Sequence, residues 1–321
     1  MALEKQVNWG IVGAGRIAEK FCEDMTYVRN GKLAAIAARS ADKAQQFADK
    51  FHIQYAYAGY QRLFDDPNID VVYIATTHNF HFEHARAALL AGKSVLCEKP
   101  ITISTEQCVE LQSIAKQQNV FLMEALWTYF LPSIIKAKQW VEEGLIGKIK
   151  HIKADFGYRV PYDPVGRMYN PDLAGGCLLD MGIYPLAIAH YFNPVDLTDL
   201  TLKAQKAATG VDNDLVILAT AGDVTLSLAT SFQCRLQNAA LIIGEKGYIK
   251  IPDFWRAKSC ELYKMDTKID AFIDTEPCIG YCYEAIAVAE QLLQNKTEHP
   301  TAPLSTSLIL QQQMERIRSM F

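Results

Sequence analysis

Hydrophobic and polar positions follow two alternating patterns along the first 125 residues. Short apolar runs, typical of strands buried on both faces, are separated by amphipathic stretches with helical spacing. The predicted strands are 7–12, 32–38, 70–75, 94–97 and 121–123. The predicted helices between them are 17–27, 41–51, 81–91 and 105–118. This order predicts α/β architecture with a doubly wound parallel sheet.

The pattern changes after residue 127, where strand candidates follow a single helix and are joined by turn signals such as Ala221-Gly222-Asp223. Such turns are typical of hairpins in an antiparallel sheet. The predicted strands are 148–156, 200–207, 215–220, 224–232, 239–243 and 248–251. The predicted helices are 133–143, 175–191, 282–294 and 305–320. We therefore predict two closely packed domains, 1–125 and 126–321, the second an α+β domain with an open, mainly antiparallel sheet and a last helix that packs back on the first domain.

Composition places the chain among soluble globular proteins. Of its 321 residues, 50% are hydrophobic and 21% are charged, which is the balance of a packed domain rather than of a disordered or fibrous chain. No run of about 18 uncharged apolar residues occurs, so we expect no membrane span. The first residues lack the apolar segment of a secretory signal, so we expect a cytoplasmic protein.

Charge and cysteine content argue against two further classes of site. Lys and Arg total 32 against 36 Asp and Glu, without the basic excess of a nucleic-acid binder. The eight cysteines are scattered in apolar segments and are expected to be reduced, buried thiols. Cys278 and Cys282 lie close in sequence but have no second pair to complete a zinc site. We therefore expect no nucleic-acid partner and no metal.

The turn after the first predicted strand has the sequence Gly13-Ala14-Gly15-Arg16-Ile17-Ala18. The first glycine permits a tight turn, and the second lets the backbone approach a pyrophosphate. The following helix offers its N-terminal amides to the phosphates. An ordinary tight turn is the alternative, but a strand before the motif and a helix after it favour a dinucleotide-binding Rossmann domain. Gly13, Gly15, Arg16 and Ile17 are the candidate cofactor contacts.

The end of the second predicted strand bears on the choice between NAD and NADP. An NAD site usually has an acidic residue there, which binds the ribose 2′-hydroxyl. This chain has Arg39 and Ser40 instead, with Lys43 one turn later. Guanidinium and hydroxyl groups suit a 2′-phosphate, and the alternative is a solvated arginine. The sequence favours NADP, with NAD as a possibility.

The segment Glu98-Lys99-Pro100 ends the strand 94–97. Doubly wound sheets bind ligands at the carboxyl ends of their strands. A lysine at such an end can donate a proton or a hydrogen bond to a developing alkoxide. The proline excludes helical backbone at Lys99 and is compatible with a cis peptide bond. The alternative is a solvated lysine at a strand end.

Three histidines, His78, His81 and His84, follow the strand 70–75 at a spacing of three residues. The spacing resembles one helical face and raises the possibility of metal ligands. No carboxylate or thiolate completes a recognisable ligand set nearby, so we predict no metal. We expect His81 to cap the turn or to contact the cofactor ribose instead.

The second informative segment runs from Gly175 to Pro185. Asp180 and Tyr184 are four residues apart, so on a helix both side chains project from one face. A neighbouring lysine lowers the pKa of a tyrosine, which then exchanges protons with a carbonyl or an alcohol. The alternative is a buried tyrosine hydrogen-bonded to a carboxylate. Arg167, in the polar loop upstream, is a candidate to line a substrate pocket.

Together these segments resemble the glucose–fructose oxidoreductase and inositol dehydrogenase (Gfo/Idh/MocA) family over nearly the whole chain. The likeness rests on the 13–18 turn, the stretch 75–81, Glu98-Lys99-Pro100 and 175–184. Many members have histidine where this chain has Tyr184. The tyrosine, with 123–128 and 170–176, most resembles the dimeric dihydrodiol dehydrogenase and D-xylose dehydrogenase branch.

The resemblance implies an enzyme that uses NADP and oxidises vicinal diols or aldoses. It implies Lys99 and Tyr184 at the reacting oxygen with Asp180 beside them, and it implies Trp127 and Phe156 near the substrate. The remaining cofactor-binding candidates share the ends of two neighbouring strands. They are Thr76, Thr77, Asn79, His81, Glu98 and Lys99. One departure is Tyr129, because the branch commonly has arginine after Trp-Thr, which leaves the substrate open.

Three possible functions remain. The first is an NADP-dependent oxidoreductase acting on a secondary alcohol or hemiacetal carbon of a sugar or vicinal diol. The alternative is a non-catalytic dinucleotide-binding sensor on the same fold. An enzyme that uses NAD internally for elimination or epimerisation is a weaker third possibility. A sensor needs only the phosphate-binding turn, so the presence of Lys99, Asp180 and Tyr184 together favours the enzyme.

The strand 224–232 suggests how the second domain associates. Its alternate positions are Val224, Leu226, Leu228 and Thr230 on one face, against small, weakly polar residues on the other. An uncharged, exposed sheet face is usually covered by a partner. Members of the family often associate through this sheet. We therefore predict a homodimer formed through the open face of the C-terminal sheet.

Overall fold

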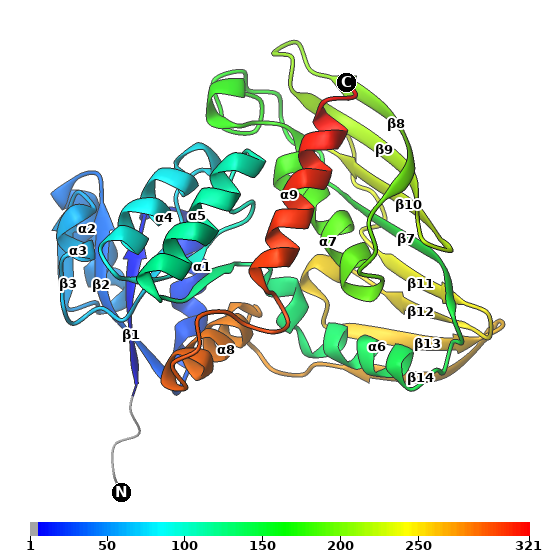
Figure 1. Cartoon of the computed structure of the whole chain (residues 1–321), viewed down its shortest axis with the longest axis horizontal. Coiled ribbons are helices and arrows are strands. Elements are labelled where there is room, and N and C mark those ends of the chain that lie inside the picture. The colour runs from blue at the N-terminus through cyan, green and yellow to red at the C-terminus, as the bar shows by residue number, and fades with distance from the viewer. Residues whose placement is uncertain (1–5) are drawn as a thin grey trace, which may run out of the picture. The chain divides into compact units, whose positions relative to one another are not determined.

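The computed structural model describes residues 6–321, which form two units (Figure 1). The first unit contains Met1–Trp127 and Cys278–Gln311, and the second contains Thr128–Pro277 and Gln312–Phe321. This division differs from the single predicted boundary near residue 125. The chain returns to the first unit at Cys278, because helix α8 (Tyr281–Leu293) packs there against α1 (Arg16–Asp24). The predicted domain 126–321 is therefore not one continuous segment.

A six-stranded parallel sheet organises the first unit, in the order β3-β2-β1-β4-β5-β6. The strands are β1 (Val7–Val12), β2 (Gly31–Ala38), β3 (Tyr55–Ala58), β4 (Val71–Ile74), β5 (Ser94–Cys97) and β6 (Leu122–Glu124). The helices are α1, α2 (Ala41–Phe51), α3 (Gln61–Phe64), α4 (His81–Leu90), α5 (Thr105–Gln118), α8 and the start of α9 (Leu304–Arg318). This is the doubly wound sheet that the sequence predicts, with β3 and α3 in addition.

Alternate strand residues point to the two faces of this sheet, and helices cover both. On one face, Val12 and Ile74 join a buried cluster with apolar residues of α4 and α5, and Leu304 of α9 packs against it. On the other face, the ring of Phe21 in α1 stacks on Tyr73 with centroids 3.9 Å apart. Full burial of one such apolar side chain contributes about 1.5–3 kcal/mol. Burial on both faces explains why the strand runs are continuously apolar.

An eight-stranded sheet organises the second unit, in the order β14-β13-β12-β11-β7-β10-β9-β8. Its pairings are antiparallel except that β7 and β10 run parallel. The strands are β7 (Ile149–Gly157), β8 (Thr198–Lys206), β9 (Asp212–Ala221), β10 (Val224–Ser231), β11 (Ala240–Gly244), β12 (Tyr248–Ile251), β13 (Ser259–Lys264) and β14 (Thr267–Ile273). The open, mainly antiparallel sheet is confirmed. Strands β13 and β14 escaped prediction because the short strand β13 mixes polar and apolar residues and β14 is exposed at most of its positions.

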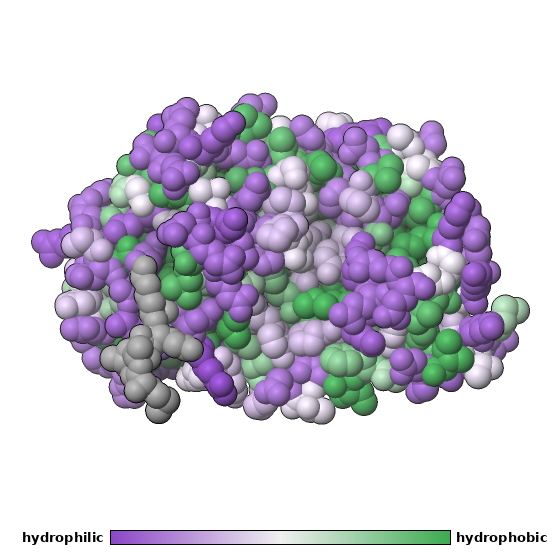
Figure 2. Space-filling model, turned by 60° about the horizontal axis from the view of Figure 1, so that its bottom comes forward, coloured by the Kyte–Doolittle hydropathy of each residue, from purple (hydrophilic) through white to green (hydrophobic). Residues whose placement is uncertain are grey.

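Helices α6 (Pro132–Glu142) and α7 (Ile183–Phe192) lie on one face of this sheet (Figure 1). Toward them, Val224, Leu226 and Leu228 of β10 are buried. On β9, alternate residues Val216 and Leu218 are 44% and 50% exposed, so apolar side chains lie on the uncovered face. Figure 2 shows green hydrophobic patches among the purple hydrophilic residues on one face of the protein.

The helical segment Pro171–Phe192 is long and apolar enough, by length and composition alone, to cross a membrane. However, 67% of its most apolar stretch is buried inside the protein. The segment contains α7, which packs against β7 and β10. Its hydrophobicity is that of a core helix.

Candidate active site

The turn after β1 has the geometry that a pyrophosphate needs. Gly13 has φ +100°, and a Cβ there would lie 3.0 Å from the carbonyl oxygen of Ala75. Gly15 is exposed and precedes α1 in extended backbone, without a side chain to cover the helix end. The first amides of a helix, here those of Arg16 and Ile17, have no partner within the helix and attract anions. The residues present therefore fit a dinucleotide phosphate.

The end of β2 is polar and cationic. Arg39, Ser40 and Lys43 are all exposed. The Ser40 hydroxyl caps α2 by accepting a hydrogen bond from the Lys43 amide at 3.4 Å. Burial raises the pKa of the nearby Tyr60, and the positive charge of Arg39 opposes that rise. A cationic group therefore faces this strand end, where an NAD-specific site has a carboxylate.

Short polar contacts fix the turn after β4. The Thr76 hydroxyl lies 3.1 Å from Nδ1 of His84, and the Thr77 hydroxyl donates to Oδ1 of Asn79 at 2.8 Å. Burial lowers the pKa of His84 to about 4. Three residues of this turn are half-buried and so remain partly accessible to a ligand: Thr76, Thr77 and Asn79.

His81 is the exception among the predicted cofactor contacts. Its ring is fully buried, with Nδ1 2.7 Å from the carbonyl oxygen of Pro100 and Nε2 3.0 Å from that of Thr76. Burial lowers the pKa of His81 to about 4, although the two carbonyl contacts act in the opposite direction. The ring therefore ties the turn after β4 to the turn after β5. That His81 contacts the cofactor ribose stays a prediction.

Lys99 follows the end of β5. Its backbone is held by buried polar groups around Glu98, which together form its polar support. The Lys99–Pro100 peptide bond is cis. Glu98 is 6% exposed, and its Oε1 accepts from the Tyr73 hydroxyl at 2.5 Å while its Oε2 accepts from the Lys99 amide at 3.2 Å. Lys99 itself is half-buried. The Glu98 carboxylate thus fixes the backbone of Lys99 through its amide.

Two further buried carboxyl groups surround this support. Glu124 is 1% exposed and accepts from the Ile101 amide at 2.9 Å, and burial raises its pKa to about 7. Glu284 of α8 is fully buried, and neither of its oxygens has a hydrogen-bond partner among residues 6–321; burial and the charge of Glu98 raise its pKa well above the usual range. Sequence analysis missed Glu284, although an acidic residue inside the apolar stretch 281–289 is an unusual signal.

In the second unit, Asp180 and Tyr184 lie where two kinds of helix meet. The predicted helix 175–191 is a π-helical turn, Leu178–Gly182, followed by α7. Asp180 belongs to the π-helical turn and Tyr184 to the first turn of α7, and both are half-buried. π-Helical turns are frequent at functional sites. Arg167 donates from Nη1 to Oδ1 of Asp180 at 3.0 Å, so two predicted site residues form an ion pair.

Aromatic rings surround Tyr184. Its ring meets Phe156 edge to face with centroids 5.3 Å apart. Phe156 in turn stacks on Trp255 at 4.9 Å, and Trp255 also approaches Tyr184 at 6.3 Å. The structure thus brings the predicted pair Phe156 and Tyr184 together. It adds Trp255, which lies in a turn region where the sequence shows no periodic pattern.

Trp127 and Tyr129 have separate surroundings. Trp127, in the first unit, is 2% exposed and stacks on Tyr281 at 4.4 Å. Tyr129, in the second unit, donates from its hydroxyl to the carbonyl oxygen of Ala187 at 2.7 Å. Tyr129, where the chain departs from the branch pattern, is therefore part of the core and stabilises α7, the helix that carries Tyr184.

Two family models match the chain. The oxidoreductase family with an NAD-binding Rossmann fold, GFO_IDH_MocA, matches residues 7–126. The GFO/IDH/MocA C-terminal domain matches residues 134–250.

Similar proteins extend over the whole length. A trans-1,2-dihydrobenzene-1,2-diol dehydrogenase of Xenopus laevis is 34% identical over 98% of this chain and 99% of that protein. An NADP(+) D-xylose 1-dehydrogenase of Hypocrea jecorina is 30% identical over 96% and 90%. The fold matches an aldose-aldose oxidoreductase from Caulobacter crescentus with a TM-score of 0.90 at 21% identity, covering 98% and 97% of the two chains. The chain therefore belongs to the GFO/IDH/MocA family of oxidoreductases and carries its NAD-binding Rossmann domain.

Proposed function

We propose that this protein is an NADP-dependent dehydrogenase acting on a secondary alcohol or hemiacetal carbon of a sugar or vicinal diol. The observation that carries the proposal is the combination of a phosphate-binding turn with two proton-bearing groups, Lys99 on a buried polar support and Tyr184 among aromatic rings. The Xenopus laevis relative is named for a diol and the Hypocrea jecorina relative for D-xylose and NADP. These names support the substrate class.

The cofactor is held by the first unit in this proposal. Gly13, Gly15 and the first turn of α1 bind the pyrophosphate, because the backbone is open there and the helix end favours anions. Arg39, Ser40 and Lys43 bind the 2′-phosphate through charge-assisted contacts. When bound, the nicotinamide accepts or donates the hydride.

The chain's own residues move the proton and hold the substrate. Tyr184 exchanges a proton with the reacting hydroxyl, because a carbinol releases hydride only as its proton departs. Lys99 holds the reacting oxygen through its ammonium group. Asp180, paired with Arg167, orients the polar groups beside Tyr184. Phe156 and Trp127 lie near the substrate in this proposal, as buried rings that pack behind it rather than as exposed contact surfaces.

A substrate screen tests the proposal. Aldoses, inositols and vicinal diols are each incubated with NADP and with NAD, and the absorbance of the reduced nicotinamide is followed. We expect turnover with at least one sugar or diol and a preference for NADP. Tight cofactor binding with no turnover on any substrate would instead favour the non-catalytic sensor.

We also propose a homodimer formed through the uncovered face of the second unit's sheet. Val216 and Leu218 of β9 lie exposed on that face, and their partners on the adjacent strand β10 are Ala229 and Ser227. Exposed apolar side chains on an open sheet face are favourably covered by a second copy. Ser231, assigned to this face by the alternation of β10, is fully buried. Light scattering at micromolar concentration tests the proposal, and a single species of 36.0 kDa would contradict it.

A further inference from the structure

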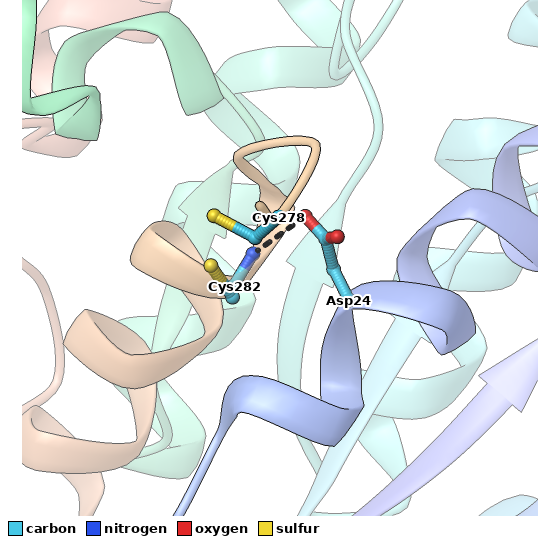
Figure 3. Close-up of side chains that lie close together, drawn as sticks. All are labelled: Asp24, Cys278 and Cys282. Carbon is cyan, nitrogen blue, oxygen red and sulfur yellow. Dashed lines mark hydrogen bonds between the residues drawn. The ribbon is translucent and has the colours of Figure 1, made fainter. Parts of the chain in front are cut away.

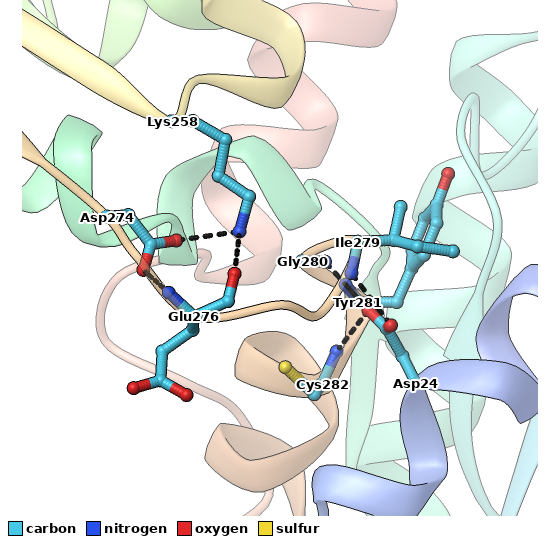
Figure 4. Close-up of polar contacts among 8 residues, drawn as sticks. All are labelled: Asp24, Lys258, Asp274, Glu276, Ile279, Gly280, Tyr281 and Cys282. Carbon is cyan, nitrogen blue, oxygen red and sulfur yellow. Dashed lines mark hydrogen bonds and ion pairs between the residues drawn. The ribbon is translucent and has the colours of Figure 1, made fainter.

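The start of α8 is built around one carboxylate from another helix end. Asp24, the last residue of α1, is 2% exposed. Its Oδ1 accepts from the Ile279 amide at 2.8 Å, and its Oδ2 accepts from the amides of Gly280 and Tyr281 at 2.7 Å each and of Cys282 at 3.3 Å (Figure 4). The carboxylate thus replaces the missing partners of the first helical amides. It fixes the backbone of four consecutive residues.

Two cysteines bracket this fixed turn. Cys278 precedes it and Cys282 ends it, and the two residues are 4% and 2% exposed. Their sulfur atoms and a carboxylate oxygen of Asp24 lie within 4.8 Å of one another. Figure 3 shows both sulfur atoms extending to the same side, away from the Asp24 carboxylate. The turn therefore presents two thiols as neighbours.

A metal ion is the first alternative for such a group. Structural zinc sites have four ligands, whereas the group found among the described residues has three. Both oxygens of Asp24 already accept amide hydrogen bonds. In addition, the N-terminus of α8 carries a partial positive charge, which disfavours a cation. The surroundings favour chemistry between the two sulfur atoms themselves.

We propose that Cys278 and Cys282 form a reversible disulfide, with hydrogen peroxide as the oxidant. One thiolate attacks the peroxide, which releases water and leaves a sulfenic acid on that cysteine. The second thiol then attacks the sulfenic sulfur, forms the S–S bond and releases a second water. The two thiols lose two electrons and two protons, and one peroxide is reduced to two waters. A dithiol reductant reverses the reaction.

The fixed backbone explains why this pair is singled out from the other buried cysteines. Closing a loop costs chain entropy, and the four hydrogen bonds to Asp24 have already ordered the residues between the two sulfurs. The preceding segment is also held, since Lys258 donates to Asp274 at 2.9 Å and to the Glu276 carbonyl oxygen at 3.0 Å (Figure 4). A loop this short gains little stability from a cross-link, so the disulfide remains easy to reduce.

Peptide mass analysis tests the proposal directly. The Cys234→Ser protein, which lacks the exposed thiol, is treated with peroxide, denatured, alkylated and digested with trypsin. Cleavage after Lys268 and Lys296 releases one peptide, 269–296, that contains both Cys278 and Cys282 and no other cysteine. We expect this peptide to carry neither alkyl label and to be lighter by two hydrogens than the reduced, unlabelled peptide. Reduction with dithiothreitol before alkylation should restore both labels.

A matched internal control lies in the same digest. Peptide 94–116, in which Pro100 blocks cleavage after Lys99, also contains two buried cysteines, Cys97 and Cys108. It should keep both labels. Unchanged labelling of 269–296, or equal loss from both peptides, would overturn the proposal.

A second variant and a metal assay complete the test. Peroxide treatment of Cys282→Ser should yield no disulfide at Cys278. Zinc bound one per chain in the reduced protein and lost in Cys282→Ser would show a metal site and overturn the disulfide.

Discussion

The two units surround their candidate proton-bearing residues in different ways. Lys99 lies beside a cluster of buried carboxyl groups, in which Glu98 is hydrogen-bonded and Glu284 has no hydrogen-bond partner within the part of the chain that the structure describes. Tyr184 stands among aromatic rings, with one partly exposed ion pair nearby, Arg167–Asp180. Buried ionisable groups therefore define the surroundings of Lys99, whereas packed aromatic rings define those of Tyr184. The charge around Lys99 should therefore change with pH, whereas the surroundings of Tyr184 should depend on how the rings pack.

The cost of burying charge explains this difference. An ionised carboxyl group without hydrogen bonds is strongly disfavoured in a protein interior, so it binds a proton instead. Burial raises the pKa of Glu124 to about 7, and the charge of Lys99 opposes the rise. Aromatic packing has no such dependence on protonation. The support of Lys99 thus changes its charge within the range where the protein is handled, while the rings around Tyr184 do not.

The largest effect is expected at Tyr184 and Lys99, the two residues to which the proposed function assigns proton transfer and binding of the reacting oxygen. General acid–base catalysis contributes about 10²–10⁴-fold, so Tyr184→Phe should reduce turnover by that factor. Its affinity for NADP should stay nearly unchanged, because the cofactor contacts lie in the other unit. Lys99→Ala should reduce turnover at least as much and also weaken cofactor binding. Steady-state kinetics and cofactor titration of both variants measure this.

The outcome also separates the two residues. If Tyr184→Phe kept most of its activity, the tyrosine would be a packing residue, and Lys99 would become the candidate proton donor.

The next effect concerns the buried carboxyl Glu124. Its pKa rises from 4.5 unfolded to about 7 folded, so the folded state binds more protons between these values. The free energy of unfolding should therefore fall as pH rises from 4.5 to 7, by on the order of 3 kcal/mol from this residue. Denaturant unfolding across this range measures the slope.

Glu124→Gln supplies the comparison for that measurement. The amide keeps the shape and cannot ionise, so the difference between the two proteins isolates Glu124. His81 and His84 act in the opposite sense, since burial lowers the pKa of each from 6.5 to about 4 and stability is lost as pH falls through that range. Their contribution is the same in both proteins and cancels. Parallel pH profiles would show that Glu124 stays ionised in the fold.

The parallel sheet of the first unit can be predicted from the sequence because burial on both of its faces produces continuous apolar runs. Strands β1, β2, β4, β5 and β6 follow from such runs. Edge strands carry a weaker signal: β3 is half exposed, and β14 is exposed at most of its positions. The return of residues 278–311 to the first unit also has no local signal, because it depends on the packing of α8 against α1.

The candidate site shows the same limit. Gly13, Lys99 and Tyr184 are found from turns, strand ends and helical spacing. Glu284 and Trp255 join their surroundings only through contacts between segments far apart in sequence. The direction of the His81 ring likewise depends on the carbonyl of Pro100, 19 residues away.

A smaller effect tests the cationic end of β2, where the first unit exposes its charge instead of burying it. A charge-assisted contact with a phosphate contributes about 1.5–3 kcal/mol, so Arg39→Ala should weaken NADP binding about ten- to a hundredfold. NAD lacks the 2′-phosphate, and its affinity should not change. Titration of both cofactors into the wild-type protein and the variant measures the preference. Tighter binding of NAD by the wild-type protein, or an unchanged preference in Arg39→Ala, would contradict the proposed NADP specificity.

The smallest effect separates two roles of a single hydroxyl at this strand end. Ser40 caps α2 through the Lys43 amide at 3.4 Å, and Ser104 caps α5 through the Gln107 amide at 3.3 Å. Removal of such a cap costs about 1 kcal/mol, so Ser40→Ala and Ser104→Ala should lower the free energy of unfolding by similar amounts. If Ser40 also binds the 2′-phosphate, only Ser40→Ala should in addition weaken NADP binding relative to NAD. Unfolding curves and cofactor titrations on both variants distinguish the roles, and equal NADP affinities would leave Ser40 as a helix cap alone.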